Sequence, residues 1–494
     1  MSEDGDGFRS IITGSGVVFG GIVLELLISL VGKVLIARYL GKVDYGGVAL
    51  GVTILVMTST VVLAGIHTGV GRYLPRFDDP TDRNGLIWGA LAIVGGLSLL
   101  VAAVVASSAE WIASVVFDEP GLSDLLVVIA IALPASALMR LAIGITQGYQ
   151  LSLPKVVVRN LTFPLTRLLG FAAVIVVGAG SIGVAGAYVA AYLIAACVGL
   201  WYVYKLTDIS PSVPGDTHVR ELVSFSAPLF LTGVLSLVLS DVDTLMLGAL
   251  STQADVGIYN VVYPTAILLL IFLRSFRFLY MPRISELDEA DQRAAIRSNY
   301  DLITKWLYFT TTPVLVLFVV RSEWIITLLY GAEYAPGSRA LVILALGFYF
   351  HSVLGLNGTT LTSLGWTRAI LAVNIVAAVA NIVLNLYLIP RYSLIGAAIA
   401  TTLSYVLINA LYSSVLYVRT GIVPARRPIL LLSVMISPIA FAVYRLSQGS
   451  GEFVSWVSFL VFVVAYTALF VRIVGVSDEA KDIISDVVRR YRTG

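Results

Sequence analysis

The stretch Leu86–Ala106 reads LIWGALAIVGGLSLLVAAVVA and holds no charged side chain. Its apolar residues occupy odd and even positions alike, as do those of Gly396–Val418, which excludes the alternating pattern of a membrane β-barrel strand. A helix needs ~20 mostly apolar residues to cross the hydrocarbon core of a bilayer, and both stretches meet that length. They therefore predict transmembrane α-helices.

Comparable stretches recur from Ile11 to Val474, separated by short polar breaks. Hydrophobic residues make up 58% of the chain, charged residues only 13%, and the mean hydropathy is +0.93. This composition predicts an all-α integral membrane protein of about fourteen spans. The expected spans are 11–38, 47–71, 85–107, 123–145, 155–178, 182–204, 222–250, 257–280, 302–320, 338–362, 367–389, 394–418, 427–445 and 453–474.

Lysine and arginine are distributed unevenly between alternate loops. Most of them lie on the side of the N-terminus, whereas the opposite loops hold only Arg38, Lys42, Arg321, Arg339, Arg391 and Arg445. Cytoplasmic loops retain such cations. We therefore expect a multi-pass protein of the cell membrane with both termini in the cytoplasm.

Three short motifs occur twice at nearly the same offset. Tyr73–Arg76 recurs as Tyr280–Arg283, Asp44–Gly46 as Asp255–Gly257, and Val184–Ala187 as Leu394–Ala397. Many transporter folds arise from duplicated halves, so we predict two six-helix bundles around a central cavity. The expected boundaries are 1–210 and 211–420 for the bundles, 421–475 for two additional helices and 476–494 for an amphipathic cytoplasmic tail. Residues 284–300 have similar amphipathic spacing.

Several kinds of chemistry lack a sequence signal. Cys197 is the only cysteine, and His67, His218 and His351 are isolated from one another and from carboxylates at metal-site spacing. No glycine-rich phosphate loop of the nucleotide-binding type is present. We therefore expect no cofactor, no metal, no nucleic-acid partner and no enzymatic activity.

Ionisable residues inside the expected spans include more cations than carboxylates. Such groups are costly in the hydrocarbon layer unless they are paired or hydrated, so they indicate a water-filled path or a ligand site. A cationic cavity favours an anionic ligand, and guanidinium binds phosphate through paired donors. The candidates are Glu25, Lys33, Arg38, Arg140, Arg159, Arg167, Asp241, Asp243, Arg274 and Arg277.

Each candidate also has a purely structural interpretation. Arg38, Arg72, Arg159 and Arg277 lie near span ends, where snorkelling to the interface is as good an explanation as ligand contact. Lys33, Arg167 and Arg274 lie deeper, which favours a cavity. Glu25 and Asp243 could couple an ion or proton, or could neutralise a nearby cation.

A row of amides follows one face of the expected span 367–389. Asn374, Asn381 and Asn385 have helical spacing, and amides in a cationic cavity suit the hydroxyl groups of a sugar. The alternative is that they hydrogen-bond one helix to another.

Several motifs together resemble a known family. They are Ala37–Gly41 followed by Asp44–Gly46, Asp243–Gly248 followed by Asp255–Asn260, Tyr330–Tyr334, and Asn381–Pro390 followed by Gly396–Ala400. In order and spacing they are similar to the polysaccharide and oligosaccharide flippases of the multidrug/oligosaccharidyl-lipid/polysaccharide superfamily.

The resemblance implies transport by alternating access. The cargo would be an oligosaccharide on a polyprenyl or dolichyl phosphate, and its lipid tail would stay in the bilayer along a groove made with the last two spans. By position alone, Lys33, Arg38, Arg72, Arg167 and Arg274 match the cationic residues that the family uses for phosphate. Expected partners are membrane lipids and glycosyltransferases or an oligosaccharyltransferase of the same pathway.

Two other classes of protein remain open. One is a drug or metabolite antiporter of the same superfamily, driven by Na⁺ or H⁺; the extra pair of spans and the excess of cations argue against it. The other is a membrane-bound glycan polymerase, ligase or glycosyltransferase, but the outer loops, such as 110–124 and 321–339, are short for a catalytic domain.

Overall fold

The computed structural model describes residues 3–207, 209, 217–423, 427–449 and 451–475. All secondary structure in these ranges is helical, and the predicted tail 476–494 lies outside them. The helices are α1 (Glu3–Leu63), α2 (Ile66–Tyr73), η1 (Leu74–Arg76), α3 (Pro80–Ser107), α4 (Ala109–Trp111), η2 (Ile112–Val116), α5 (Leu122–Gly148), α6 (Leu153–Lys155), η3 (Val156–Thr162), α7 (Phe163–Val177), α8 (Gly180–Leu206), α9 (Val219–Ser240), α10 (Val242–Leu250), α11 (Gln253–Ala266), η4 (Ile267–Leu270), α12 (Ile271–Glu289), α13 (Arg293–Tyr330), η5 (Ala332–Gly337), α14 (Ser338–Leu354), α15 (Leu356–Ser363), α16 (Thr367–Thr420), α17 (Arg427–Gly449) and α18 (Glu452–Ile473).

Twelve helical segments of the described chain are long and apolar enough to cross a membrane. Two of the longest contain a kink where two helices join: α1 at Gly41, with φ 73°, and α16 at Ser393, with φ 51°. In α16, Pro390 also removes a backbone donor just before the kink. The predicted count of fourteen requires that each half of both helices crosses the membrane, and it stays a prediction.

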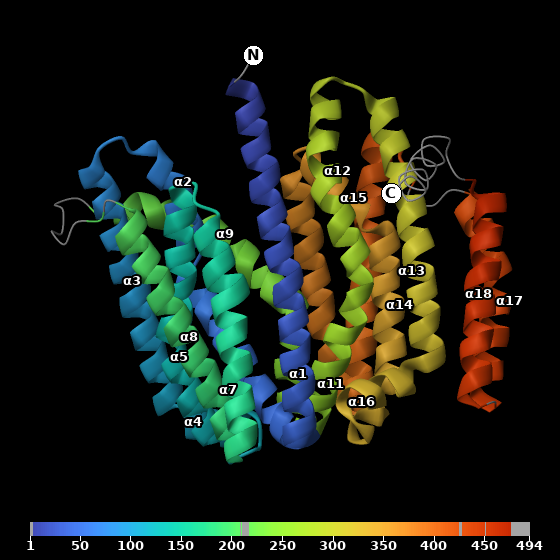
Figure 1. Ribbon diagram of the computed structural model, residues 1–494, viewed down its shortest axis with the longest axis horizontal. Helices are drawn as coiled ribbons and strands as arrows, with labels where there is room; N and C mark the ends of the chain where they lie inside the picture. The colour runs from blue at the N-terminus through green and yellow to red at the C-terminus, as the bar shows by residue number, and fades with distance from the viewer. Residues whose placement is uncertain (1–2, 208, 210–216, 424–426, 450, 476–494) are drawn as a thin grey trace, which may run out of the picture. The chain divides into compact units, whose positions relative to one another are not determined.

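The chain divides into two compact units. Unit 1 contains residues 1–261, 327–336 and 382–397, and unit 2 contains residues 262–326, 337–381 and 398–494. In unit 1, α5 contacts α1, α2, α3 and α8, and α7 also packs on α8 (Figure 1). Leu126, Leu133 and Leu141 of α5 are almost completely buried, because the helix has neighbours on several sides.

The repeated Asp-x-Gly motifs meet within unit 1. A Cβ atom placed on Gly46 would lie 2.0 Å from the carbonyl oxygen of Gln253, and one on Gly257 would lie 1.9 Å from that of Lys42. Each carbonyl belongs to the residue four positions before the other glycine, so the contact is reciprocal. Glycine is required here because the two backbones touch where a side chain would stand.

Two of the family-like motifs are joined next to this contact. Arg38 donates from Nε to the carbonyl oxygen of Leu329 at 2.8 Å and from Nη2 to that of Leu328. These carbonyls belong to the last turn of α13, which lacks helical partners, so the guanidinium caps the helix. The Tyr334 hydroxyl donates to the carbonyl oxygen of Ala37 at 2.9 Å. The stretch 37–41 is thereby fixed to the stretch 328–334.

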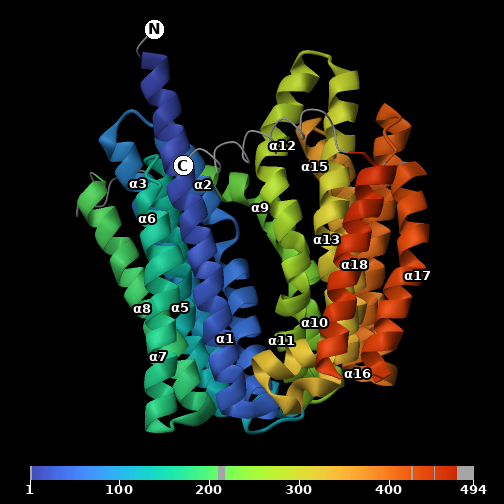
Figure 2. The same cartoon turned by 45° about the vertical axis from the view of Figure 1, so that its right-hand side comes forward.

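Unit 2 attaches its last two helices through an aromatic core. The helices α17 and α18 run side by side and pack on α13 (Figure 2). The Tyr466 hydroxyl donates to the backbone carbonyl of Tyr308 at 2.9 Å, and the Tyr308 hydroxyl lies 2.8 Å from Ser433 Oγ. Phe309 stacks on Tyr466 with ring centroids 6.0 Å apart.

The amphipathic stretch 284–300 is two helix ends and not one surface helix. The helix α12 ends at Glu289 and α13 begins at Arg293, with a turn between them. Ile284, Ile296 and Tyr300 are almost completely buried. The apolar positions therefore serve packing between the two helix ends.

Candidate functional site

Unit 1 contains a polar pocket of about 370 Å³. Its cations are Arg140, Lys155 and Arg159, and its one carboxylate is that of Glu25. The other lining residues are His67, Thr68, Met139, Ile143, Gln147, Phe163 and Tyr192. We call these residues the basic pocket.

Local helix geometry positions the cations of the basic pocket. Arg140 lies on α5, whereas Arg159 lies on η3, a π-helical turn between Pro154 and Pro164. A π-helical turn shifts the side chains that follow it around the helix and often occurs at functional sites. The Arg140 guanidinium is oriented by a hydrogen bond from Nη1 to Thr60 Oγ1 at 3.2 Å.

Cations outnumber carboxylates around the basic pocket. Glu25 interacts electrostatically with Arg159, Arg167 and Lys155, so one carboxylate faces three cations. Tyr192 and Phe163 place their rings against each other with centroids 4.4 Å apart. A pocket that combines excess positive charge with an aromatic wall can hold a phosphate group and stack a sugar ring.

Arg167 lies next to the basic pocket, but it is not a lining residue. Its Nη2 donates to Ser29 Oγ at 2.9 Å, and its guanidinium lies over the rings of Phe163, Phe171 and Tyr188 at 5.2, 5.9 and 5.5 Å. These contacts orient the side chain, and its Nε remains a buried donor without a hydrogen-bond partner.

Lys33 interacts electrostatically with the residues beside the basic pocket. It is half-buried on α1 and interacts with Arg167 and with Asp241, which follows α9. The structure therefore brings Glu25, Lys33 and Arg167 of the predicted set together.

Arg38 and Arg72 do not belong to this group. Arg38 caps α13, as described above, and Arg72 is exposed with its guanidinium 4.4 Å above the ring of Phe225. Neither lines the basic pocket.

Arg274 and Asn374 lie in unit 2. Arg274 is exposed on α12 and interacts electrostatically with Arg277, one turn along the helix, which also interacts with Tyr412. The Tyr412 hydroxyl donates to Asn374 Oδ1 at 2.7 Å. Unit 2 therefore has a polar, cationic group of its own.

A buried carboxylate and a buried amide of the predicted set meet in unit 1. Asp243 of α10 is 2% exposed and accepts hydrogen bonds from Tyr259 Oη at 2.8 Å and Asn385 Nδ2 at 2.6 Å. Asn381, one turn earlier on α16, is also buried. A carboxylate with hydroxyl and amide neighbours is an arrangement that can hold a proton or a small cation.

We predict strong coupling between Asp243 and Asn385. Replacement of either one by alanine removes one hydrogen bond of a buried partner and should lower the free energy of unfolding by about 1–3 kcal/mol. The double variant should cost less than the sum of the two single variants, with a coupling energy of about 1–3 kcal/mol. Unfolding of the purified protein in detergent measures it, with Asn374→Ala as an amide control on the same helix. Strict additivity would contradict the contact.

Sequence reasoning did not place Gln147, Lys155 or Tyr192 in a site. The sequence indicates that Arg140 and Arg159 are intramembrane cations, but it gives no reason to favour them over Lys33 and Arg274. Two prolines ten residues apart, Pro154 and Pro164, are the signal that surrounds the π-helical turn.

Comparison with known proteins decides the family. Residues 11–288, more than half of the 494, match the family described as polysaccharide biosynthesis protein. The chain belongs to this family. A second family, MatE, matches residues 228–387. The predicted membership among the polysaccharide flippases of the multidrug/oligosaccharidyl-lipid/polysaccharide superfamily is confirmed.

Relatives of the family are similar over less than half of this chain. Agl15 of Haloferax volcanii, a probable low-salt glycan biosynthesis flippase, is 24% identical over 212 residues, which are 42% of this chain and 45% of the relative. AglR of the same organism, a probable flippase, is 28% identical over 216 residues, 42% of this chain and 44% of the relative. The capsular polysaccharide biosynthesis protein CapF of Staphylococcus aureus is 22% identical over 214 residues, 42% of this chain and 53% of the relative. The matches span about half the length of these relatives.

Solved structures share the fold of this family member. The lipid II flippase MurJ in an inward closed conformation superimposes with a TM-score of 0.76 at 16% identity, over 93% of this chain and 99% of MurJ. An inward-facing multidrug resistance transporter of the MATE family gives a TM-score of 0.64 at 13% identity, over 80% of this chain and 94% of the transporter. The predicted all-α, multi-pass membrane fold is confirmed.

Proposed function

We propose that this protein is a flippase that moves an oligosaccharide linked to a polyprenyl or dolichyl phosphate from the cytoplasmic to the outer leaflet. The observation that carries the proposal is the basic pocket, in which three cations and one carboxylate surround a polar space of about 370 Å³. Membership of the polysaccharide biosynthesis protein family supports it, and so do the flippase names of Agl15 and AglR. The activity is transport and involves no covalent change of the cargo.

The basic pocket and its neighbours divide the recognition of the cargo. Arg140, Lys155 and Arg159 bind the phosphate, and Lys33 and Arg167 supply further positive charge beside it. Gln147 and Tyr192 contact the sugar. We also propose that Arg38 and Arg72 contact the cargo, but we favour them less than the other cations. Each already has a contact that accounts for its position.

Asp243, Tyr259 and Asn385 together form what we call the Asp243 cluster. This cluster and the polar groups of unit 2 take the remaining roles. Arg274, Asn374 and Asn381 contribute to the cargo path, and Asn385 acts together with Asp243. Asp243 and Glu25 are the proposed sites for a coupling proton or cation, because Glu25 lies in the candidate membrane span Leu24–Leu63 and Asp243 is a buried carboxylate on α10.

The proposed setting is the cell membrane with both termini in the cytoplasm, on the basis of the loop cations. The partners are glycosyltransferases that complete the lipid-linked oligosaccharide on the cytoplasmic side, and an oligosaccharyltransferase or polysaccharide assembly enzyme that uses it outside.

The second candidate function is that of a cation-coupled multidrug or metabolite antiporter. It is favoured by the MatE match over residues 228–387 and by the buried Asp243. The excess of cations in the basic pocket argues against it, because cationic drugs would be repelled.

Deletion of the gene in its host distinguishes the two functions. We expect lipid-linked oligosaccharide to accumulate in the cytoplasmic leaflet, where an impermeant sugar-modifying reagent cannot reach it, together with loss of finished surface glycan. Complementation with the wild-type gene is the control. Normal glycan with new sensitivity to toxic cations would favour the antiporter.

A further inference from the structure

A second pocket lies wholly within unit 2, far along the chain from the basic pocket. It has a volume of about 920 Å³ and is lined by α13, α14 and α17. This volume is near the upper end of the roughly 300–1,000 Å³ that is typical of ligand pockets. We call it the α17 pocket.

One end of the α17 pocket lies where helices begin and end. The helix α13 loses helical geometry at Arg321, α14 begins at Ser338, α17 ends at Gly449 and α18 begins at Glu452. Trp324 lines the pocket, and Trp456 packs against it with ring centroids 5.1 Å apart. Helix ends with tryptophan are typical of the membrane interface, so this end of the pocket lies at the level of lipid headgroups.

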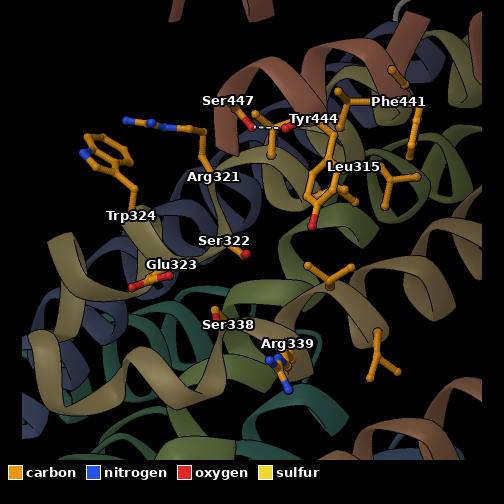
Figure 3. Close-up of a pocket in the computed structure, with 16 residues that line it drawn as sticks. Leu315, Arg321, Ser322, Glu323, Trp324, Ser338, Arg339, Phe441, Tyr444 and Ser447 are labelled. Atoms are coloured by element: carbon orange, nitrogen blue, oxygen red, sulfur yellow. Dashed lines mark hydrogen bonds between the residues drawn. The ribbon is translucent and has the colours of Figure 1, made fainter. Parts of the chain in front are cut away.

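The polar and apolar residues of the α17 pocket are separated in space. Arg321, Glu323 and Trp324 lie on one side and Leu315 and Phe441 on the other, and Arg339 lies apart from both groups (Figure 3). Val316, Val319 and Val342 add further apolar lining. A space with a charged end and an apolar wall matches a molecule that has a polar head and a hydrocarbon chain.

The two arginines of the α17 pocket differ in their contacts. Arg321 is 9% exposed, and its Nε and Nη2 have no hydrogen-bond partner. Its Nη1 donates to Ser455 Oγ at 3.1 Å, and its Nη2 forms a long ion pair with Glu452 Oε1 at 3.8 Å. Arg339 is exposed and has no hydrogen bond or ion pair with any residue that the structure describes. Arg339 is therefore the cation of this pocket whose donors are open to a ligand, whereas Nε and Nη2 of Arg321 are enclosed by protein.

We infer that the α17 pocket binds one anionic two-chain phospholipid of the bilayer. Its phosphate accepts from Arg339, and one hydrocarbon chain lies along Leu315, Val319 and Phe441. Arg321 pairs with Glu452, whereas Arg339 has no carboxylate partner among the described residues, which favours an anionic over a zwitterionic headgroup. The lipid fills the space between α17 and the pair α13 and α14, and so stabilises the attachment of the last two helices. This lipid is not the transported cargo.

Thermal unfolding of the full-length protein in detergent tests the inference with three additives: phosphatidylglycerol, phosphatidylcholine with the same chains, and glycerol 1-phosphate. We expect phosphatidylglycerol to raise the melting temperature most and to be retained in native mass spectra. Arg339→Gln should raise the phosphatidylglycerol concentration required by about tenfold, because a charge-assisted hydrogen bond is lost. The matched control is Arg445→Gln, which removes an exposed arginine of α17 outside the pocket.

A second variant tests the apolar part of the α17 pocket without a change of charge. Val319→Trp fills the apolar part of the pocket and should abolish retention of phosphatidylglycerol while Arg339 is intact. Equal stabilisation by phosphatidylcholine, or an unchanged response of both pocket variants, would overturn the proposal. Full stabilisation by glycerol 1-phosphate would also overturn it, because it would identify a site for free phosphate.

Discussion

Replacement of both Arg140 and Arg159 by glutamine is expected to slow transport of a lipid-linked oligosaccharide by about 100-fold. Each guanidinium makes a charge-assisted contact with phosphate, and loss of such a contact costs about 1.5 kcal/mol or more. Since 1.4 kcal/mol corresponds to a factor of ten, two lost contacts give about two orders of magnitude. Transport is measured with purified protein in vesicles, as the rate at which the sugar becomes accessible to an impermeant reagent.

Two controls separate a loss of binding from a loss of folding. The double variant Arg283→Gln, Arg293→Gln removes the same number of charges from exposed ion pairs with Glu286 and Asp291, and it should transport normally. Arg140→Lys with Arg159→Lys keeps the charge and should recover part of the rate. Equal rates in the glutamine double variant and the wild type would remove the basic pocket from the mechanism.

The second large effect is expected at the reciprocal glycine contact. Gly257→Ala places a Cβ atom 1.9 Å from the carbonyl oxygen of Lys42, and the obstacle is backbone, which has no alternative rotamer. Overpacking typically costs about 1–3 kcal/mol, and here we expect a cost of about 3 kcal/mol because the helices have to separate. The lower melting temperature should be accompanied by a loss of transport.

Gly186→Ala is the matched control for this glycine. A Cβ atom on Gly186 meets no atom within 4 Å, and the residue lies inside the helix α8. Alanine is favoured over glycine in a helix by up to about 1 kcal/mol, so this variant should be neutral or more stable. Similar melting temperatures for both variants would show that the backbones at Gly46 and Gly257 do not touch.

The helical spans could be predicted because composition and length determine them. Apolar stretches such as Leu86–Ala106 correspond closely to α3, and the expected breaks after residues 38 and 389 are followed by the kinks at Gly41 and Ser393. At Gly41 and Ser393 the backbone has a positive φ, and the helix continues beyond each residue in a new direction. The hydropathy pattern therefore separates spans that the backbone geometry joins.

Only some residues of the site could be predicted from the sequence. The boundaries of a span give neither the depth of a side chain in the membrane nor the direction in which it points. Arg159 follows a polar break, which is typical of a snorkelling residue, and only the π-helical turn of η3 directs it into the pocket. Arg38 has its partners 290 and 291 residues away, in the last turn of α13. The periodicity of a single helix contains no information about such contacts.

The Asp243 cluster shows what sequence reasoning could provide. The sequence places both Asp243 and Asn385 in expected spans but indicates different roles for them. They are 142 residues apart in the chain and 2.6 Å apart in space. Their pairing follows from the packing of α10 against α16, which no local pattern indicates.

The most direct test of the central claim is a transport measurement with the purified protein alone in vesicles. A lipid-linked oligosaccharide on polyprenyl phosphate is placed in the inner leaflet, and an impermeant sugar-modifying reagent outside reports its arrival. A flippase should give exposure well above that of empty vesicles, and the Arg140 and Arg159 double glutamine variant should slow this exposure by about 100-fold. Exposure equal to that of empty vesicles, with cation-driven uptake of a cationic dye by the same preparation, would contradict it.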